Sequence, residues 1–362
     1  MARSLVALHS TDPVTVYLSV WARTSEFAPA ELERALYDER SLVRVLGMRR
    51  TLFVVPRELV PVVYAACTRT IAARERKRLE KLVAESEITT RAGAWVTRAS
   101  TEALDTLGEQ SDPITTAELV KAKPLLAKRL RVGVGTRWET TQSAGARVLS
   151  QLSMEGSVLR ARPGGTWTSG RYSWSPTEHW LGAPIEELDS GEARAELLRR
   201  WLAAFGPASE TDIRWWTGWT AAEARSALAE VPHAVVDLEG AQGVVLADDV
   251  EPVERREPSA ALLPLLDPTV MGWKERDWYL GPHAETLFDR NGNAGPTVWW
   301  NARVVGGWTH RSDGEIAIRL LEDVGAEGET AIEREAERLQ GWLGEIRFRP
   351  SFLPPFHRTL AE

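Results

Sequence analysis

Residues 142–174, QSAGARVLSQLSMEGSVLRARPGGTWTSGRYSW, determine the fold class. Their first part predicts a helix over residues 142–155, because Val148, Leu149 and Leu152 recur at helical spacing. Two runs with strand character, SVLRARP and RYSW, follow, and the glycine-rich loop GGTWTSG joins them. This order is typical of the end of a winged-helix unit, in which the helix can enter the major groove and the hairpin can contact the DNA backbone.

The preceding residues predict the other two helices of such a unit. One short helix is expected over residues 99–108. The run PITTAELVKA starts at a turn-forming Asp-Pro pair, and Thr116 is placed to cap a helix that begins at Ala117. Three helices followed by a hairpin predict a winged-helix unit over residues 96–180.

The same order of elements returns later in the chain. Helices are predicted over residues 192–205 and 220–230, with Ser209 as the expected cap in the segment between them. The strands HAVVDLEG and GVVLAD complete a further winged-helix unit over residues 181–256. These two blocks indicate a tandem array.

The N-terminal part has the pattern of a degraded first copy. The run PAELERALYDERSLVRVL, which includes Leu42 and Val43, predicts a helix, and the strand-like TLFVV follows it. A highly charged helix is expected over residues 59–85. We therefore expect a winged-helix-like unit over residues 1–95.

The character of the sequence changes to strand-rich runs over residues 257–362. These runs are ALLPLLDP, RDWYLG, PTVWWNARVVGGWT, GEIAIRLL and a final EIRFRP, and one helix is expected over residues 326–343. Turns are predicted at Asn301-Ala302 and Asp313-Gly314. The predicted fold class is therefore α+β, with tandem winged-helix units followed by a small β-barrel-like domain.

Composition limits the class of protein. The 362 residues suffice for two to four domains, 43% of them are hydrophobic and 26% are charged, and no apolar run is long enough for a membrane helix. The N-terminal stretch lacks the apolar core of a signal peptide, so we expect a cytoplasmic, nucleoid-associated protein. Cys67 is the single cysteine, which excludes intramolecular disulfides and a cysteine-rich zinc site.

The net charge of -7 conceals an asymmetry along the chain. Residues 1–178 hold 26 Lys and Arg against 19 Asp and Glu, whereas the remaining residues hold 18 against 32. A basic first half suits contacts with DNA phosphates. The alternative is that these charges are ordinary solvated helix faces.

Familiar catalytic motifs are absent from the sequence. It contains no phosphate-binding P-loop, no dinucleotide-binding glycine motif and no zinc-protease motif, which argues against nucleotide and zinc hydrolysis. The loop DRNGNAG resembles a calcium loop, but Ala294 and Trp300 stand where glycine and glutamate are needed. We interpret it as a tight turn, so the sequence predicts neither a metal nor a cofactor.

The segment Leu8-His9-Ser10-Thr11-Asp12-Pro13 is the candidate active site. Pro13 favours an extended conformation at Asp12, and in an extended stretch His9 and Thr11 lie on one face. Two polar groups then converge on one site. The alternative is that His9 is a surface or capping residue.

Tryptophans beside basic residues are candidates for DNA contacts, because an aromatic ring can stack on a base while a cation binds phosphate. Most of the 16 tryptophans are equally well explained as core residues. The candidates for DNA binding are Arg49, Arg50, Arg137, Trp138, Arg160 and Arg162.

Three segments carry a family resemblance: LVALHSTDPVTVYLSVWAR, AELERALYDERSLVRVLGMRRTLFVV and DRNGNAGPTVWWNARVVGGW. They resemble the AlkZ-like winged-helix family, which includes bacterial DNA glycosylases that unhook alkylated and crosslinked DNA. The resemblance covers nearly the whole chain and implies tandem winged-helix units with a C-terminal β-barrel. The family's catalytic motif is Gln, an apolar residue, then Gln or Asp, and some members begin it with His. His9, Ser10 and Thr11 occupy these positions here, so neither Gln is kept.

The resemblance implies a monofunctional glycosylase that removes N7- or N3-alkylated, possibly crosslinked, purines from double-stranded DNA as a monomer. Alkylation makes the base a cationic leaving group, so modest assistance to an attacking water suffices. A neutral His9 can accept the proton of that water, a step typically worth about 10²–10⁴-fold. Thr11 is expected to hold the water, and Asp12 to orient His9 or to stabilise positive charge on the sugar.

Two other functions remain open at this stage. A non-catalytic DNA-binding protein, such as a regulator or a lesion binder, is favoured by the departure from the Gln motif. A drug-sequestering protein has only the aromatic content in its favour. Release of a free base from alkylated DNA distinguishes the first function from these two.

Overall fold

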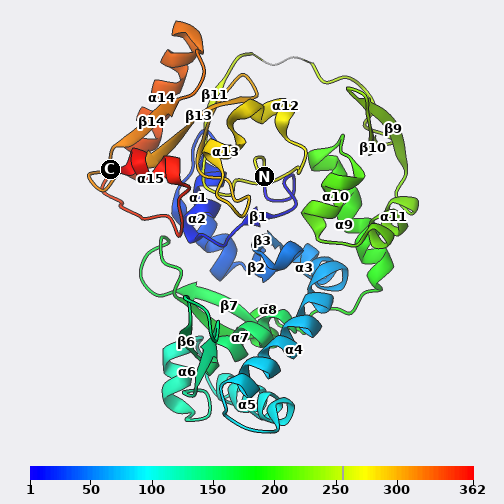
Figure 1. Cartoon of the computed structure of the whole chain (residues 1–362), viewed down its shortest axis with the longest axis vertical. Coiled ribbons are helices and arrows are strands. Elements are labelled where there is room, and N and C mark those ends of the chain that lie inside the picture. Colours follow the sequence, from blue (N-terminus) through cyan, green and yellow to red (C-terminus); the bar gives the residue numbers. More distant parts are fainter. Residues whose placement is uncertain (255–256) are drawn as a thin grey trace. The chain divides into compact units, whose positions relative to one another are not determined.

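The computed structural model describes residues 1–254 and 257–362, which form two compact units (Figure 1). One unit is the continuous segment Leu32–Leu197. The other combines Met1–Glu31 with Leu198–Glu362, so the N-terminal segment folds with the second half of the chain. Among the described helices, none is long and apolar enough to cross a membrane. The four domains expected from the sequence divide the chain at other positions and stay predictions.

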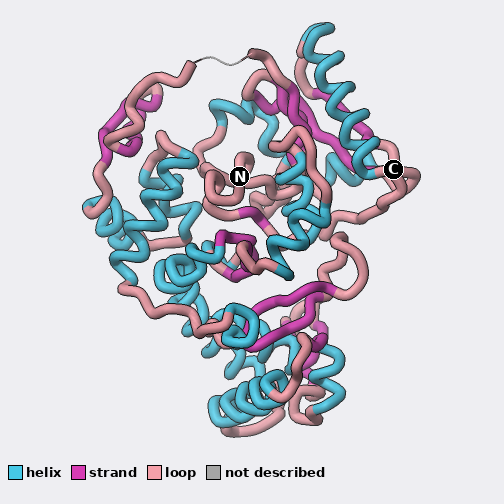
Figure 2. Tube along the Cα trace, turned by 180° about the vertical axis from the view of Figure 1, so that it is seen from behind, coloured by secondary structure: helices cyan, strands magenta, loops and turns pink. Residues whose placement is uncertain are grey.

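The unit Leu32–Leu197 follows α2 (Pro29–Glu33) and is mainly helical, with short strands (Figure 2). Its elements in chain order are η1 (Arg34–Asp38), β2 (Leu42–Leu46), η2 (Met48–Arg50), β3 (Leu52–Pro56), η3 (Arg57–Leu59), α3 (Val60–Val63), η4 (Tyr64–Thr68), α4 (Arg69–Glu85), α5 (Ala92–Gly108), β4 (Ile114–Thr115), α6 (Thr116–Ala122), β5 (Arg129–Val132), β6 (Thr140–Ser143), α7 (Ala144–Met154), β7 (Val158–Pro163), β8 (Tyr172–Pro176) and α8 (Thr177–Leu181).

The first segment of this unit is a helix followed by a hairpin. The predicted helix over PAELERALYDERSLVRVL ends at Asp38, and the part containing Leu42 and Val43 is wrong, because β2 pairs there with β3 in antiparallel register. Four of the five residues of β2 are buried, including Arg44, whose Nη1 donates to the Tyr37 hydroxyl at 3.0 Å. Leu42 and Val43 continue the apolar spacing of the helix before them, which is why the sequence favoured a longer helix. The strand predicted at TLFVV is confirmed.

Helices α4, α5, α6 and α7 share one hydrophobic core with β8. Its fully buried members include Val83, Val96, Leu119, Val148, Leu149 and Leu152. Because α4 and α5 contribute to the same core, the expected domain boundary at residues 95/96 falls inside α5 (Ala92–Gly108). Thr115 rather than Thr116 caps α6, since its Oγ1 accepts the Glu118 N–H in a capping box.

Strands β4, β8 and β7 form a three-stranded antiparallel sheet in that order, and β5 pairs with β6 in a separate hairpin before α7. The helix and hairpin predicted from residues 142–174 are confirmed as α7, β7 and β8. The β5–β6 hairpin was not predicted, because only one of its eight residues is buried.

The other unit contains β1 (Leu8–His9) and α1 (Pro13–Trp21) from the N-terminal segment. Its remaining elements are α9 (Ser190–Phe205), α10 (Glu210–Thr217), α11 (Ala221–Ala229), β9 (His233–Leu238), β10 (Ala241–Leu246), β11 (Ala260–Leu263), α12 (Asp277–Leu280), η5 (Gly281–His283), α13 (Ala284–Leu287), β12 (Thr297–Trp300), β13 (Arg303–His310), β14 (Ile316–Leu320), α14 (Gly325–Leu343) and α15 (Pro355–Ala361). The helices predicted at 192–205 and 220–230, the Ser209 cap and the following hairpin are confirmed.

The strand-rich part is an open sheet and not the expected barrel. Strands β11, β12, β13 and β14 pair antiparallel in this order, and among the described residues no further strand joins the two edges. The expected turns are present, since Asn301 and Ala302 have positive φ of 48° and 64° and Gly314 has 104°. Helix α14 lies along this sheet (Figures 1 and 2).

Two strands predicted in this part are wrong. The run RDWYLG contains helix α12, which begins at Asp277. The run EIRFRP forms no strand, because Arg347 donates to the Gly344 carbonyl oxygen at 2.7 Å and the chain turns there after α14. The final helix α15 was not predicted.

Two side chains of α1 and Arg23, which follows the helix, fasten the N-terminal segment to the loop 265–269. Thr15 Oγ1 donates to the Leu265 carbonyl oxygen, and Ser19 Oγ donates to Asp267 Oδ2, each at 2.9 Å. Arg23 binds both oxygens of the fully buried Asp267, at 2.6 and 2.9 Å. Burial opposes the charge of Arg23, but the Asp267 carboxylate outweighs burial and raises the pKa of the guanidinium. This bidentate ion pair fixes the position of α1.

We expect Asp267→Asn to lower the free energy of unfolding by about 3 kcal/mol, because it leaves the charge of Arg23 buried without a counter-charge. The matched control is Glu210→Gln, which removes the partner of Arg225 from a surface pair whose side chains are 40% and 64% exposed. Such a pair is worth less than about 1 kcal/mol. Urea titration of both variants measures the difference, and equal losses would contradict a special role for Asp267.

Helix α15 packs the fully buried His357 against two glycines. A Cβ atom on Gly295 would overlap the His357 ring, and one on Gly307 would lie 2.9 Å from Nε2. Nε2–H donates to the Pro296 carbonyl oxygen at 2.7 Å, whereas Nδ1 has no hydrogen-bond partner among the described residues. Burial lowers the pKa of His357 to about 4, and the bond to Pro296 offsets this only in part.

We expect acid to destabilise this unit through His357. The unfolded side chain has a pKa of about 6.5, so stability is complete above that pH and declines as the pH falls towards about 4, by about 3 kcal/mol in total. His357→Gln, whose amide can also donate to Pro296, should lose less stability between pH 7 and pH 4 than the parent protein. Chemical denaturation at several pH values measures this. An unchanged pH dependence would exclude His357 as the cause.

Candidate active site and nucleic-acid interface

The segment that follows β1 buries the first two motif residues and exposes the third. His9 is 4% exposed and Ser10 is 1% exposed, whereas Thr11 is exposed and lies in a bend. Strand β1 ends at His9, whereas the extended conformation expected at Asp12 is confirmed, with φ of -96° and ψ of 126°. The two residues differ in their access to solvent, since His9 is buried and Thr11 is exposed. Their roles stay predictions.

Asp12 is the N-cap of α1. Its Oδ1 accepts the Val14 N–H at 3.0 Å, and its Oδ2 accepts the Ser351 N–H at 2.7 Å. The carboxylate is 3% exposed and is held from both sides by backbone donors. Asp12 lies three residues after His9 and thus determines where α1 begins. It also ties this turn to the C-terminal segment.

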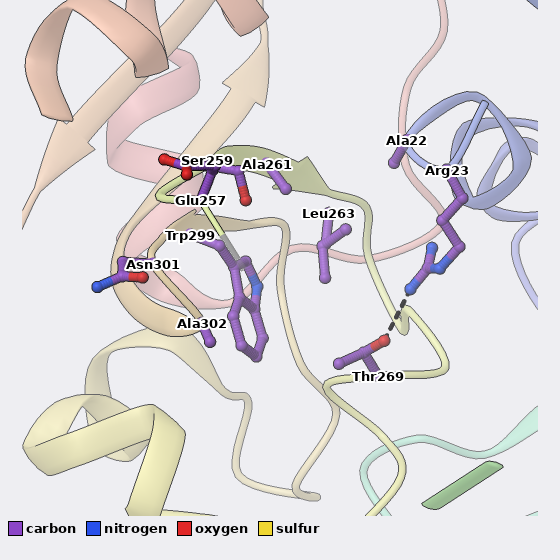
Figure 3. Close-up of a pocket in the computed structure, with 10 residues that line it drawn as sticks. All are labelled: Ala22, Arg23, Glu257, Ser259, Ala261, Leu263, Thr269, Trp299, Asn301 and Ala302. Atoms are coloured by element: carbon purple, nitrogen blue, oxygen red, sulfur yellow. Dashed lines mark hydrogen bonds between the residues drawn. The ribbon is translucent and has the colours of Figure 1, made fainter. Parts of the chain in front are cut away.

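A cavity of about 640 Å³ opens beside the C-terminal end of α1 (Figure 3). Its lining includes Arg23, Leu263, Trp299, Asn301 and Ala302, and Arg23 donates to Thr269 at its edge at 2.8 Å. The nine residues of α1 rise by about 13 Å, so this cavity and His9 lie at opposite ends of the helix. The guanidinium of Arg23 is already occupied by Asp267, which leaves the cavity walls mainly apolar.

Arg49 and Arg50 form the turn of the β2–β3 hairpin. Both adopt positive φ, 51° and 60°, a conformation that costs an ordinary residue about 1 kcal/mol or more. Arg50 is exposed and its Nη2 binds Glu75 Oε2 of α4 at 2.7 Å. The turn therefore presents two adjacent cations on a strained backbone.

Arg137 and Trp138 lie in the loop that joins β5 to β6. Trp138 is 59% exposed, and the Arg137 guanidinium lies 4.0 Å from its ring centroid. Glu139 accepts hydrogen bonds from the Gly135 N–H at 2.9 Å and from Arg131 at 2.8 Å, which hold the loop. The same hydrogen bonds lower the pKa of Glu139, and the bond from the Gly135 N–H has the largest effect. The loop thus presents a large aromatic ring to solvent in a fixed form.

The two arginines of β7 already have protein partners. Arg160 is half-buried, lies 4.6 Å from the Trp174 ring and donates to Ser153 Oγ at 3.2 Å. Burial, with the charge of Arg44, lowers its pKa to about 10. Arg162 is exposed and binds Asp38 at 2.9 Å. A phosphate would have to compete with these contacts.

Helix α7 is largely covered, although it was expected to enter the major groove. Eight of its eleven residues are buried, and Gln151 Nε2 donates to the Ala72 carbonyl oxygen of α4 at 3.0 Å. Only Ala146, Arg147 and Ser150 reach solvent. This leaves α7 without a polar face long enough to read base edges.

Asp267 and Ser351 could not be predicted as site residues, because they lie 244 to 339 positions from the residues they hold. A metal centre is not built by the described residues, since no three His, Cys, Asp or Glu side chains gather as ligands. The loop at Asp289 is a tight turn, as predicted, in which Oδ1 accepts the N–H groups of Asn291 and Asn293.

The comparisons with known proteins identify the family. Residues 2–342 match the family model described as DNA glycosylase AlkZ-like. The solved structure of Streptomyces sahachiroi DNA glycosylase AlkZ has a similar fold, with a TM-score of 0.70, 20% sequence identity, and coverage of 95% of this chain and 90% of that chain. No curated protein matches. Because the family model spans nearly the whole sequence, this chain belongs to the AlkZ-like family of DNA glycosylases.

Proposed function

We propose that the protein is a monofunctional DNA glycosylase that removes N7- or N3-alkylated purines from duplex DNA. Membership of the AlkZ-like family is the observation that carries this proposal. Such a purine carries positive charge and leaves readily, so the protein chiefly has to extrude the base and admit one water to the sugar. These tasks need neither a nucleotide cofactor nor a redox group.

His9 is the proposed catalytic base. A neutral imidazole can accept the proton of the attacking water as the bond from the sugar to the base breaks. The cap at Asp12 and the ion pair of Arg23 support this role, because they fix α1 and with it the turn after His9. Preorganisation of this kind keeps a general base in position. Thr11, at the exposed edge, is proposed to orient the water.

The unit Leu32–Leu197 is proposed to supply a winged-helix DNA contact. The order α5, β4, α6, α7, β7, β8 and the sheet order β4-β8-β7 support this assignment. Because α7 is largely buried, the contacts are assigned to the β7–β8 wing and to the β5–β6 loop with Trp138. This unit holds 25 Lys and Arg against 21 Asp and Glu, while the other holds 19 against 30, which favours the first for phosphate binding.

A non-catalytic lesion-binding protein is the second candidate. The observation that favours it is Thr11, which stands in place of a Gln or Asp and has no acid-base capacity near neutral pH. Such a protein would bind alkylated DNA without releasing the base.

We expect the protein to release free base from DNA that carries N7- or N3-alkylated purines and to leave an abasic site without added metal. His9→Ala should slow single-turnover release by about 10²-fold or more, the usual contribution of a general base, while DNA affinity stays nearly unchanged. Thr11→Ala should have a smaller effect, since it orients the water and takes no proton. His179→Ala, an exposed histidine on α8, is the control.

The products of this reaction separate the candidates. Tight binding without base release by the parent protein would favour the lesion-binding protein. Release by His9→Ala at the parent rate would keep the enzyme class and reject His9 as the base.

We expect Trp138→Ala to weaken binding to DNA that contains an unpaired or alkylated base by about tenfold, because stacking on a base is worth about 1–3 kcal/mol. Trp278→Ala is the matched control, since its ring is 60% exposed compared with 59% for Trp138. Fluorescence anisotropy with labelled duplexes measures both. Equal losses in the two variants would show that exposed tryptophan in general, and not the β5–β6 loop, determines affinity.

A further inference from the structure

Two arginines from separate elements bind one carboxylate in the unit Leu32–Leu197, and a third arginine lies within electrostatic reach of them. Glu75 of α4 is bound by Arg50 Nη2 of the β2–β3 turn at 2.7 Å and by Arg78 Nη1 of α4 at 3.8 Å. Arg147 of α7 lies within electrostatic reach of all three groups: burial first, then the charges of Arg50 and Arg78, lower its pKa, while Glu75 raises it. The group holds three positive charges and one negative charge.

This arrangement is open to a ligand. The side chains of Arg50 and Arg78 are 40% and 59% exposed, so an anion in solution can reach both. Arg147 is half-buried, and its Nε has no hydrogen-bond partner among the described residues. Like charges close together, with a buried N–H that has no acceptor, reduce the stability of the folded protein when no ligand is bound. An anion in their midst would remove that cost.

The surroundings of these arginines favour a role in positioning DNA over a role in reading its base sequence. Arg147 is the one charged side chain that α7 brings to solvent, so this helix offers a cation and no row of base-reading groups. Arg50 is held in the left-handed conformation, where strain is retained mainly for function. Glu75 orients Arg50 and Arg78 before any ligand arrives.

We propose that Arg50, Arg78 and Arg147 form a binding site for one phosphodiester group of the DNA backbone. Guanidinium groups match phosphate oxygens in paired hydrogen bonds, and three of them can surround one phosphate. The site rests on the proposed function only for its ligand, duplex DNA. It adds Arg78 and Arg147 as residues that set the position of the duplex and not its sequence preference.

The test is binding of an unmodified duplex oligonucleotide to the full chain at salt concentrations from about 50 to about 200 mM. Arg78→Gln combined with Arg147→Gln should weaken binding roughly tenfold at low salt and reduce the slope of log affinity against log salt by about one. The control combines Arg91→Gln with Arg98→Gln, which removes two exposed charges from the start and the surface of α5.

The control decides between a local site and general charge. Loss confined to the Arg78 and Arg147 variant supports the site, whereas equal loss in both variants, or none in either, overturns it. Inorganic phosphate is added in a parallel series with chloride matched for ionic strength. Displacement of DNA by low phosphate beyond the chloride effect would assign the site to a free phosphate and overturn the backbone proposal.

Two further measurements keep the outcome interpretable. Thermal unfolding of the Arg78 and Arg147 variant should occur at the parent temperature or above, because like charges are removed, whereas a merely structural role predicts a lower temperature. Binding to undamaged DNA requires no base release. Failure of the glycosylase assay would therefore leave this test intact, and failure of this test would leave the glycosylase assay intact.

Discussion

The buried ion pair between Arg23 and Asp267 is the constraint on which the N-terminal segment depends. A carboxylate that is fully removed from water needs a counter-charge and several donors, and Arg23, Ser19 and the Thr269 N–H supply them. The pair holds one end of α1, and the Asp12 cap holds the other end. These contacts hold α1 at both ends, and His9 and Ser10 lie shortly before the residue that caps this helix.

The two units differ in charge and in the residues that the proposed function assigns to each of them. The segment Leu32–Leu197 carries the net positive charge, the exposed Trp138 and the cluster around Glu75, all suited to a polyanion. The unit that contains His9 carries net negative charge. Net negative charge repels phosphate, so the proposed attraction to DNA is assigned to the unit Leu32–Leu197 and the proposed chemistry to the other unit.

Elements whose residue types and apolar spacing match one type of structure were predictable, and elements with a mixed signal or with little burial were not. Helix α7 and its hairpin followed from regular apolar spacing and a glycine-rich loop, and the turn at Asn301-Ala302 followed from its residue types. Strand β2 was mistaken for a helix because Leu42 and Val43 continue the helical spacing of the preceding residues. The hairpin β5–β6 was missed because only one of its eight residues is buried.

The site was predictable only where its signal is local. The pair Asp12-Pro13 identifies a helix start, and the resemblance drew attention to His9. The partners that hold this segment, Asp267 and Ser351, come near it only in the tertiary structure. The sequence around the motif contains no pattern that predicts them. Arg147 likewise looked like one more polar residue on a helix, and only the packing of α7 against α4 gave it neighbours.

The hydrogen bond from Ser351 to Asp12 has a consequence for how the protein is made. It joins positions 339 residues apart, and the loop that receives α1 lies some 250 residues beyond it. During synthesis the N-terminal motif leaves the ribosome first, yet its supports emerge only after most of the chain has been translated. The segment around His9 therefore lacks these contacts until the later residues have been synthesised. A translation product that stops before Ser351 lacks the hydrogen bond to Asp12. The candidate site can therefore have all of these supports only after the chain has been translated as far as Ser351.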